Sequence, residues 1–252
     1  MTPWTGRLIF LNVAVFLLTA FNPMFAAPLV LVPAFIPYRP WTVITYMFVH
    51  AGFGHIFFNM LALYFFGPQV ELRLGGRSFL GLYLVSGLTG ALLSWPITPY
   101  AHIVGASGAV FGVMLAFARY WPRATILIWG VLPVEARVLV VITTALSLWG
   151  GITGAQAGIA HFAHLGGFAG GYLFLRVAEA RSPAARFKAK VAPQAPARAS
   201  DGDLERWHRI DAAALHPVNR EELERVLAKV ATEGAGSITP GEREFLDRFS
   251  AR

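Results

Sequence analysis

The sequence predicts an all-α polytopic membrane protein with six transmembrane helices and a small helical tail. Hydrophobic residues make up 56% of the 252 residues and charged residues only 14%, whereas a soluble domain carries about 25% charged residues. The charge is also uneven, because residues 1–178 hold only ten charged side chains. We therefore expect a membrane domain over residues 1–178, a basic linker rich in Ala and Pro over residues 179–200, and a helical tail over residues 201–252.

Six apolar runs come close to the roughly 20 residues that a helix needs to cross about 30 Å of hydrocarbon. They cover approximately residues 8–25, 42–66, 79–95, 103–120, 134–149 and 156–177. The first run lacks a small-residue cleavage site followed by a polar chain, so we expect an uncleaved span rather than a signal peptide. Residues 124–133 are too few to cross the membrane and are expected at its surface.

The arginines predict how these spans are oriented. If the N-terminus is cytoplasmic, six spans leave only Arg39 on the outer side and every other arginine of residues 1–178 on the cytoplasmic side. Cytoplasmic loops are enriched in Lys and Arg in this way. An odd number of spans would distribute the arginines over both sides of the membrane. We expect a multi-pass protein of a cell membrane with both termini in the cytoplasm, and a bacterial cytoplasmic membrane fits best.

The net charge of +7 does not indicate a nucleic-acid partner. Most of the excess lies on arginines that flank the spans, and the tail is nearly balanced. The basic linker is expected to lie along the anionic headgroups of the lipid bilayer. The chain contains no cysteine, which excludes a disulfide framework, a thiol nucleophile and a thiolate metal site.

The tail is expected to form two short helices. Asn219 and Glu222 fit an N-cap and N3 pair, and Gly234 is expected to end the helix that follows. Thr239 and Glu242 fit a second capping box, with a proline at the first helical position. No motif in the tail carries chemistry, so we expect a solvated appendage, with an unknown cytoplasmic binding partner as the open alternative.

Polar side chains at membrane depth are costly and are therefore functional candidates. Within the expected spans they are His50, His55, Asn59, Ser107, His161 and His164. No Asp precedes Asp201, and no Glu is expected at depth. This excludes a pair of catalytic aspartates, an H-E-x-x-H zinc site and a Ser-His-Asp triad. What remains is serine plus histidine, in which the histidine takes the proton of the serine hydroxyl.

Ser107 is the candidate nucleophile because of its neighbours. It opens the fourth span between Gly105-Ala106 and Gly108, and small residues leave its backbone N–H free to donate to an oxyanion. The dipole at a helix N-terminus supports that role. Phe111 lies one turn further along, on the same helix face as Ser107.

His164 is the candidate base. Two G-x-x-x-G patterns, beginning at Gly108 and Gly167, would let the fourth and sixth spans pack closely, as a bond between Ser107 and His164 requires. His55 and Asn59 lie four residues apart on one face of the second span. Their side-chain N–H groups could join that of the Ser107 backbone around an oxyanion.

These residues resemble the motifs of the rhomboid family of intramembrane serine proteases. The matching elements, in the family's order, are His55-x-x-x-Asn59, Gly105-Ala106-Ser107-Gly108 and Ala163-His164-Leu165-Gly166-Gly167-Phe168. The resemblance covers about residues 7–177. Two departures are Phe111, where some members carry Tyr, and Thr42 after Trp41, where some carry Arg.

The resemblance implies a six-transmembrane-helix, rhomboid-like bundle that needs no cofactor. It implies Ser107 as nucleophile, His164 as base, and an oxyanion hole made by His55, Asn59 and the Ser107 N–H. His50 would be a structural residue of the second helix. Substrates would be single-span transmembrane proteins, hydrolysed at a peptide bond in or near the outer end of their helix.

Other interpretations stay open beside this one. His161 could join His55 in a metal or haem site, although the lack of a carboxylate or cysteine ligand favours a plain interfacial histidine and no metal. A rhomboid-like scaffold that binds client helices without cutting them is the alternative function, and the presence of both Ser107 and His164 argues against it. A transporter would need charged residues at mid-membrane, where none is expected.

Overall fold

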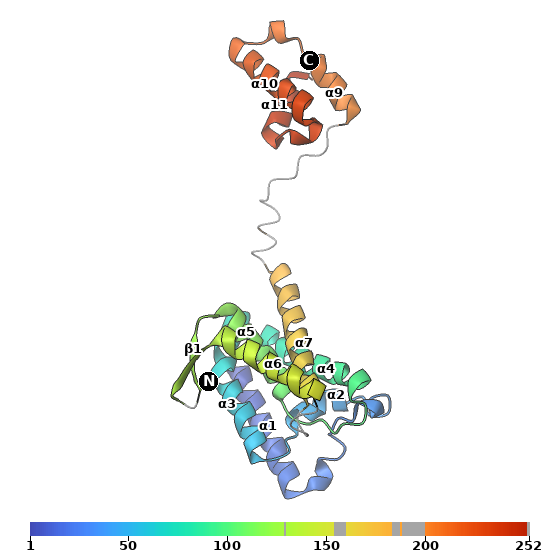
Figure 1. The fold of residues 1–252 in the computed structure, drawn as a ribbon, viewed down its shortest axis with the longest axis vertical. Coiled ribbons are helices and arrows are strands. Elements are labelled where there is room, and N and C mark those ends of the chain that lie inside the picture. The colour runs from blue at the N-terminus through green and yellow to red at the C-terminus, as the bar shows by residue number, and fades with distance from the viewer. Residues whose placement is uncertain (129, 154–159, 183–186, 188–199, 251–252) are drawn as a thin grey trace. The chain divides into compact units, whose positions relative to one another are not determined.

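The computed structural model describes residues 1–128, 130–153, 160–182, 187 and 200–250 (Figure 1). It divides into two compact units, Met1–Ser182 and Pro183–Arg252, which are described separately. Most of the expected linker, residues 183–186 and 188–199, lies outside the described residues.

The first unit is a bundle of helices with one short β-hairpin (Figure 1). Its long helices are α1 (Pro3–Phe21), α3 (Phe53–Leu74), α4 (Gly76–Ile97), α5 (Ser107–Tyr120), α6 (Ala136–Thr153) and α7 (His161–Ala180). Short helical turns are η1 (Pro23–Phe25), η2 (Pro33–Phe35), α2 (Thr42–Thr45) and η3 (Tyr46–Phe48). The hairpin consists of β1 (Thr125–Ile128) and β2 (Leu132–Glu135), and it occupies the segment expected at the membrane surface.

Length and composition alone support fewer spans than the predicted six. Among the described residues, α1, α4 and α6 are long and apolar enough to cross a membrane. The segment Thr42–Phe48 together with α3 makes a fourth candidate, bent by 95° at the break between them. Helix α5 is apolar but only 14 residues long. Helix α7 contains glycines and histidines that lower its mean hydropathy. The six-span count therefore stays a prediction.

The second predicted span is not one continuous helix. Extended backbone at Val49 and Gly52 separates the turn η3 from α3. His50 consequently lies in the connection before α3, and not within the second helix as expected. His55 and Asn59 do lie in the first two turns of α3.

The fourth predicted span begins at Ser107 and not near residue 103. Ile103 forms an isolated antiparallel bridge with Leu31, which draws the chain into an extended conformation before the helix. Gly105 then takes a φ of +113°, a conformation that side chains with a Cβ rarely adopt. Helix α5 can begin only after this bend, so Ser107 becomes its first residue.

Helix α3 runs further than expected and buries a carboxylate. The second predicted span ends near residue 66, whereas α3 continues to Leu74 and Glu71 is only 5% exposed. The Glu71 carboxylate accepts the backbone N–H groups of Trp4 (2.9 Å) and Thr5 (2.8 Å) and the hydroxyls of Thr2 (2.5 Å) and Thr5 (2.9 Å). A negative charge at a helix N-terminus satisfies the free N–H groups there. Glu71 therefore caps α1 from another helix.

Replacing Glu71 with alanine is expected to destabilise the membrane unit. The variant leaves the first turn of α1 with buried donors and no acceptor, a loss of about 1–3 kcal/mol. Thermal unfolding in detergent measures the effect. The control is Glu179→Ala, because Glu179 pairs with Arg119 at 2.6 Å but both side chains are more than a third exposed, and such pairs contribute about 0–1 kcal/mol. Equal melting temperatures for the two variants would contradict the capping role.

Helices α4, α5 and α7 form the centre of the bundle. Glycine positions bring α4 and α7 together, because a Cβ at Gly170 would collide with Thr89 and one at Gly166 would lie 2.5 Å from the Thr89 carbonyl oxygen. The Thr89 hydroxyl donates across the interface to the Gly166 carbonyl, at 2.8 Å. Small residues permit this approach of helix backbones within membranes.

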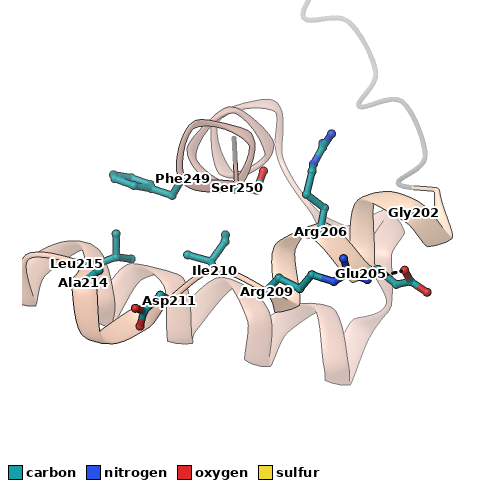
Figure 2. A pocket seen from close by; sticks show the side chains of 10 residues that line it. All are labelled: Gly202, Glu205, Arg206, Arg209, Ile210, Asp211, Ala214, Leu215, Phe249 and Ser250. Atoms are coloured by element: carbon teal, nitrogen blue, oxygen red, sulfur yellow. Dashed lines mark hydrogen bonds and ion pairs between the residues drawn. The ribbon is translucent and has the colours of Figure 1, made fainter. Parts of the chain in front are cut away.

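In the described part of the second unit, helices surround an apolar core of their own. These helices are α9 (Asp201–His208), α10 (Pro217–Glu233) and α11 (Pro240–Ser250), with the turns η4 (Ala212–Ala214) and η5 (Ala235–Ser237). Six buried residues form the centre of this core: Trp207, Leu223, Val226, Val230, Ile238 and Leu246. This unit contains a cavity of about 530 Å³. Figure 2 shows its lining, in which Ile210 and Phe249 lie among charged side chains such as Arg206 and Arg209.

The predictions for the tail were correct in part. The box of Thr239 and Glu242 is confirmed by reciprocal bonds of 2.8 and 3.2 Å, and Gly234 ends α10 with a φ of +83°. The cap at Asn219 is wrong, because α10 already begins at Pro217, which is suited to a first helical position. Helix α9 was not expected, although Ser200 and an Asp three residues later form a complete capping box.

Low pH is expected to lower the folding stability of the second unit because it protonates Glu242. Its carboxylate is 9% exposed and accepts the Thr239 N–H and bonds from Lys229 and Arg225, which lower the pKa of Glu242 to about 2. A pKa that is lower in the folded state stabilises the fold above the ordinary value of 4.5, and this contribution disappears as the pH falls from there towards 2.

Hydrogen–deuterium exchange of α10 and α11 in the full chain, corrected for intrinsic rates, measures this loss between pH 6 and pH 3. The control variant Glu242→Gln retains a capping amide without the charge. It should exchange faster than the wild-type chain at pH 6 and depend less on pH. An identical pH dependence for both chains would rule out Glu242 as the cause.

Candidate active site

Two residues that are far apart in the sequence meet near one end of the bundle. The Ser107 Oγ lies 2.7 Å from Nε2 of His164. Ser107 is the first residue of α5 and His164 lies in the first turn of α7, so both side chains sit at helix N-termini. This distance is that of a short hydrogen bond between a hydroxyl and a ring nitrogen.

Aromatic packing orients the His164 ring. The Phe111 ring stacks on it with centroids 4.4 Å apart and planes inclined by 17°. Phe168 in turn packs edge-on against Phe111 at 4.9 Å. No carboxylate bonds to His164 among the described residues, and stacking holds the ring in line with Ser107.

The close approach of α5 and α7 depends on glycine. A Cβ at Gly167 would collide with the carbonyl oxygen of Gly108, and one at Gly108 would lie 3.0 Å from the Ala163 carbonyl oxygen. One turn further, a Cβ at Gly171 would lie 2.9 Å from the Cα of Gly112. The two expected G-x-x-x-G patterns therefore face each other, and the predicted contact of these helices is confirmed.

The rings of His55 and His50 pack against the two residues that precede Ser107. A Cβ at Gly105 would collide with the His55 ring, which leaves only glycine compatible with this contact. The His50 ring packs edge-on against His55 at 5.0 Å, and its Nε2 accepts the backbone N–H of Ala106 at 3.5 Å. Within the described part of the chain, the Ser107 N–H donates no hydrogen bond.

Asn59 is buried one turn along α3 from His55. Its amide donates to the backbone carbonyl of His55 at 2.8 Å, and an amide nitrogen carries a second N–H. The structure thus brings His55 to the bend before Ser107 and leaves Asn59 bonded within its own helix.

Tyr46 is a residue that the sequence reasoning missed. It is 1% exposed, its carbonyl accepts the Gly105 N–H at 2.9 Å, and its hydroxyl donates to the Gly87 carbonyl at 2.8 Å. Tyr46 therefore fixes the backbone that leads into Ser107 to helix α4. The available signal was a tyrosine inside an apolar run, since a buried hydroxyl needs a partner.

His161 lies beside the Ser107–His164 pair. Its ring is buried and packs so closely against Gly150 of α6 that a Cβ there would collide with it. The centre of the ring lies 6.3 Å from that of His164. Among the described residues, no three His, Asp or Glu side chains are close enough together to hold a metal ion.

The described bundle defines a polytopic membrane protein in which a serine hydroxyl is bonded to a histidine ring. The Rhomboid domain family matches residues 37–179, which is more than half of the chain. The chain belongs to the rhomboid family.

Several curated proteins are similar to this chain. It is 34% identical to "Rhomboid protease GluP" of Bacillus subtilis over 134 residues, which are 52% of this chain and 25% of that protein. It is 32% identical to "Rhomboid-like protease 3" of Toxoplasma gondii over 143 residues, 55% of this chain and 52% of the relative. It is 34% identical to "Rhomboid protein 1, mitochondrial" of Saccharomyces cerevisiae over 141 residues, which are 53% of this chain and 40% of that protein. The chain thus spans about half or less of the length of these relatives.

Proposed function

We propose that this chain is an intramembrane serine endopeptidase with a Ser107–His164 dyad. The observation that carries the proposal is the 2.7 Å separation of Ser107 Oγ and His164 Nε2. The similar proteins named above include rhomboid proteases, and this supports the same activity. The proposed membrane domain is residues 1–178, the linker residues 179–200 and the tail residues 201–252.

The dyad performs two linked acyl transfers. His164 Nε2 takes the hydroxyl proton while Ser107 Oγ attacks the substrate carbonyl carbon, which gives a tetrahedral oxyanion. The imidazolium then returns its proton to the leaving amine as the C–N bond breaks. A water molecule, deprotonated by His164, attacks the acyl-enzyme, and Ser107 leaves with the proton. Stacking on Phe111 keeps Nε2 directed at Ser107 through these steps.

The oxyanion requires hydrogen-bond donors. The Ser107 N–H lies at the N-terminus of α5, where the helix dipole favours negative charge. His55 lies against Gly105, and Asn59 has a second amide N–H beyond the one that it donates to its own helix. We assign the oxyanion hole to these three groups.

The substrate proposed is a single-span transmembrane protein. Both reactive side chains lie in the first turn of their helices, so the site is near one end of the bundle. A substrate helix must unwind there, since a helical backbone does not present its carbonyl carbons to a nucleophile. With the arginine pattern of the sequence, this end is proposed to be the outer one, in a bacterial cytoplasmic membrane with both termini cytoplasmic.

The test of the activity is cleavage of a reporter transmembrane helix by the purified chain in proteoliposomes. The endopeptidase predicts two fragments separated near the outer end of the reporter helix. Binding of the reporter without fragments would favour the alternative function, a non-catalytic scaffold.

Asn59→Ala is expected to lower kcat/KM about 10²-fold, the usual effect of losing one oxyanion donor. The control is Asn12→Ala, because Asn12 is also buried and also donates to the carbonyl four residues earlier, at 2.8 Å. Both variants lose this bond within their own helix, and Asn12→Ala also loses a 3.5 Å bond to the Tyr83 hydroxyl. Only Asn59→Ala should nevertheless lose activity per folded molecule. Equal activities in the reporter assay would remove Asn59 from the oxyanion hole.

A further inference from the structure

The hairpin β1–β2 connects α5 to α6 at the end of the bundle away from Ser107. Its two strands are antiparallel, with Ile126 opposite Val134 and Ile128 opposite Leu132. In Figure 1 the hairpin extends sideways from the helices. Two backbone bonds hold its base, because the N–H of Ala136 donates to Ala124 at 2.9 Å and that of Arg137 to Pro122 at 3.1 Å.

Both faces of the outer part of this hairpin are apolar. Directly opposed residues share a face, so one face carries the pairs Ile126–Val134 and Ile128–Leu132, and the other carries Leu127–Pro133 and, at the base, Thr125–Glu135. A hairpin in water normally alternates between an apolar and a polar face. Here the charge is confined to the base, where Glu135 pairs with Arg137 at 2.6 Å, and residues 124–134 include no charged side chain.

The apolar side chains are largely uncovered by the protein. Leu127 is 59% exposed, Val131 79% and Leu132 57%. Only the base is packed, since Ile126 contacts the apolar core of the bundle. The outer half of the hairpin is therefore an apolar projection that needs a non-aqueous environment.

Residues at the base indicate what that environment is. Tyr120 and Trp121 precede the hairpin and pack edge-on at 5.9 Å, and Arg73 lies over the Tyr120 ring at 5.2 Å. The exposed Arg123 follows. Tyr and Trp are enriched at the headgroup level of membranes, and arginines there attract anionic lipids.

We propose that the hairpin is a lipid anchor whose tip enters the bilayer leaflet opposite the active site, with Arg123 at the level of anionic phosphates. Its sheet has only two strands among the described residues. Each strand therefore has one free edge, whose backbone N–H and C=O groups need polar hydrogen-bond partners. That requirement limits the depth to the interfacial region, about 5–10 Å below the surface. The anchor holds the start of α6, of which only Ala136, Ser147 and Gly150 are buried in the protein.

The absence of native cysteines allows a direct test with single labels. Val131→Cys carries a nitrobenzoxadiazole fluorophore in the full chain, reconstituted in vesicles of phosphatidylcholine and phosphatidylglycerol. Phe10→Cys is the lipid control, since Phe10 is 74% exposed on the apolar helix α1. Glu224→Cys, exposed on the polar face of α10, is the water control.

The anchor predicts that lipids with brominated acyl chains quench the Val131 label, as they quench the Phe10 label, and that aqueous iodide does not. Quenching by iodide alone, as at Glu224, would overturn the proposal. Contact between two copies would also overturn it. That outcome would appear as energy transfer between labelled chains that persists at high lipid-to-protein ratio, without quenching by brominated lipid.

Discussion

Ser107→Ala is expected to reduce cleavage of a transmembrane reporter to the background rate. Removing the nucleophile of a serine protease lowers kcat by about 10⁶-fold, and no other hydroxyl is bonded to His164 among the described residues. The fold should persist, because Ser107 is partly exposed and, among the described residues, its side chain bonds to no group but His164. Reporter cleavage in proteoliposomes and thermal unfolding in detergent measure the two effects separately.

His164→Ala is expected to behave in the same way, and the double variant should be no slower than either single variant. Because the two side chains act as one unit, removing either of them already removes the rate enhancement that they provide together. The control is Ser94→Ala, because Ser94 is fully buried and its hydroxyl donates only within α4, at 2.9 Å to Gly90. Normal cleavage by Ser107→Ala, or equal losses in Ser107→Ala and Ser94→Ala, would contradict the dyad.

Gly167→Ala is expected to impair folding and activity together. The added methyl would collide with the Gly108 carbonyl oxygen in the neighbouring helix, where backbone cannot move without separating α5 from α7. Overpacking of this kind costs about 1–3 kcal/mol and sometimes more. The same displacement lengthens the bond from Ser107 to His164, so the molecules that remain folded should also cleave more slowly.

Thermal unfolding and reporter cleavage per folded molecule measure this prediction. Gly6→Ala is the matched control, since a Cβ at Gly6 of α1 would meet only the Met1 side chain, at 3.8 Å. The control should be as stable and active as the wild-type chain. An equally stable and active Gly167→Ala variant would show that the helices tolerate a wider separation.

The sequence could predict those parts of the site that depend on local spacing. Gly108 and Gly167 each begin a visible pattern, and their pairing places Ser107 against His164 without further information. Phe111 could be placed on the face of Ser107 from helical periodicity alone. Its stacking on His164 follows from the same two helices being close.

Contacts between distant segments could not be predicted in this way. The bridge of Leu31 with Ile103 shortens α5, and nothing in the local sequence specifies that pairing. Glu71 lies beyond the second predicted span, and its charge is satisfied by the start of α1, which the local sequence does not indicate. Tyr46 likewise acts through the Gly105 backbone, which is distant in sequence. Tertiary contacts decide each of these features, whereas local periodicity decides only the helices.

Labelling with a fluorophosphonate probe shows directly whether His164 activates Ser107, because the probe reacts with a serine that a neighbouring base has activated. We expect the folded wild-type chain to be labelled at Ser107 and the labelling to disappear after heat denaturation. We also expect no labelling of Ser107→Ala and strongly reduced labelling of His164→Ala, with Ser94→Ala labelled like the wild-type chain. A folded wild-type chain that takes up no probe, or a Ser107→Ala variant that is labelled as fully, would contradict a nucleophilic Ser107 activated by His164.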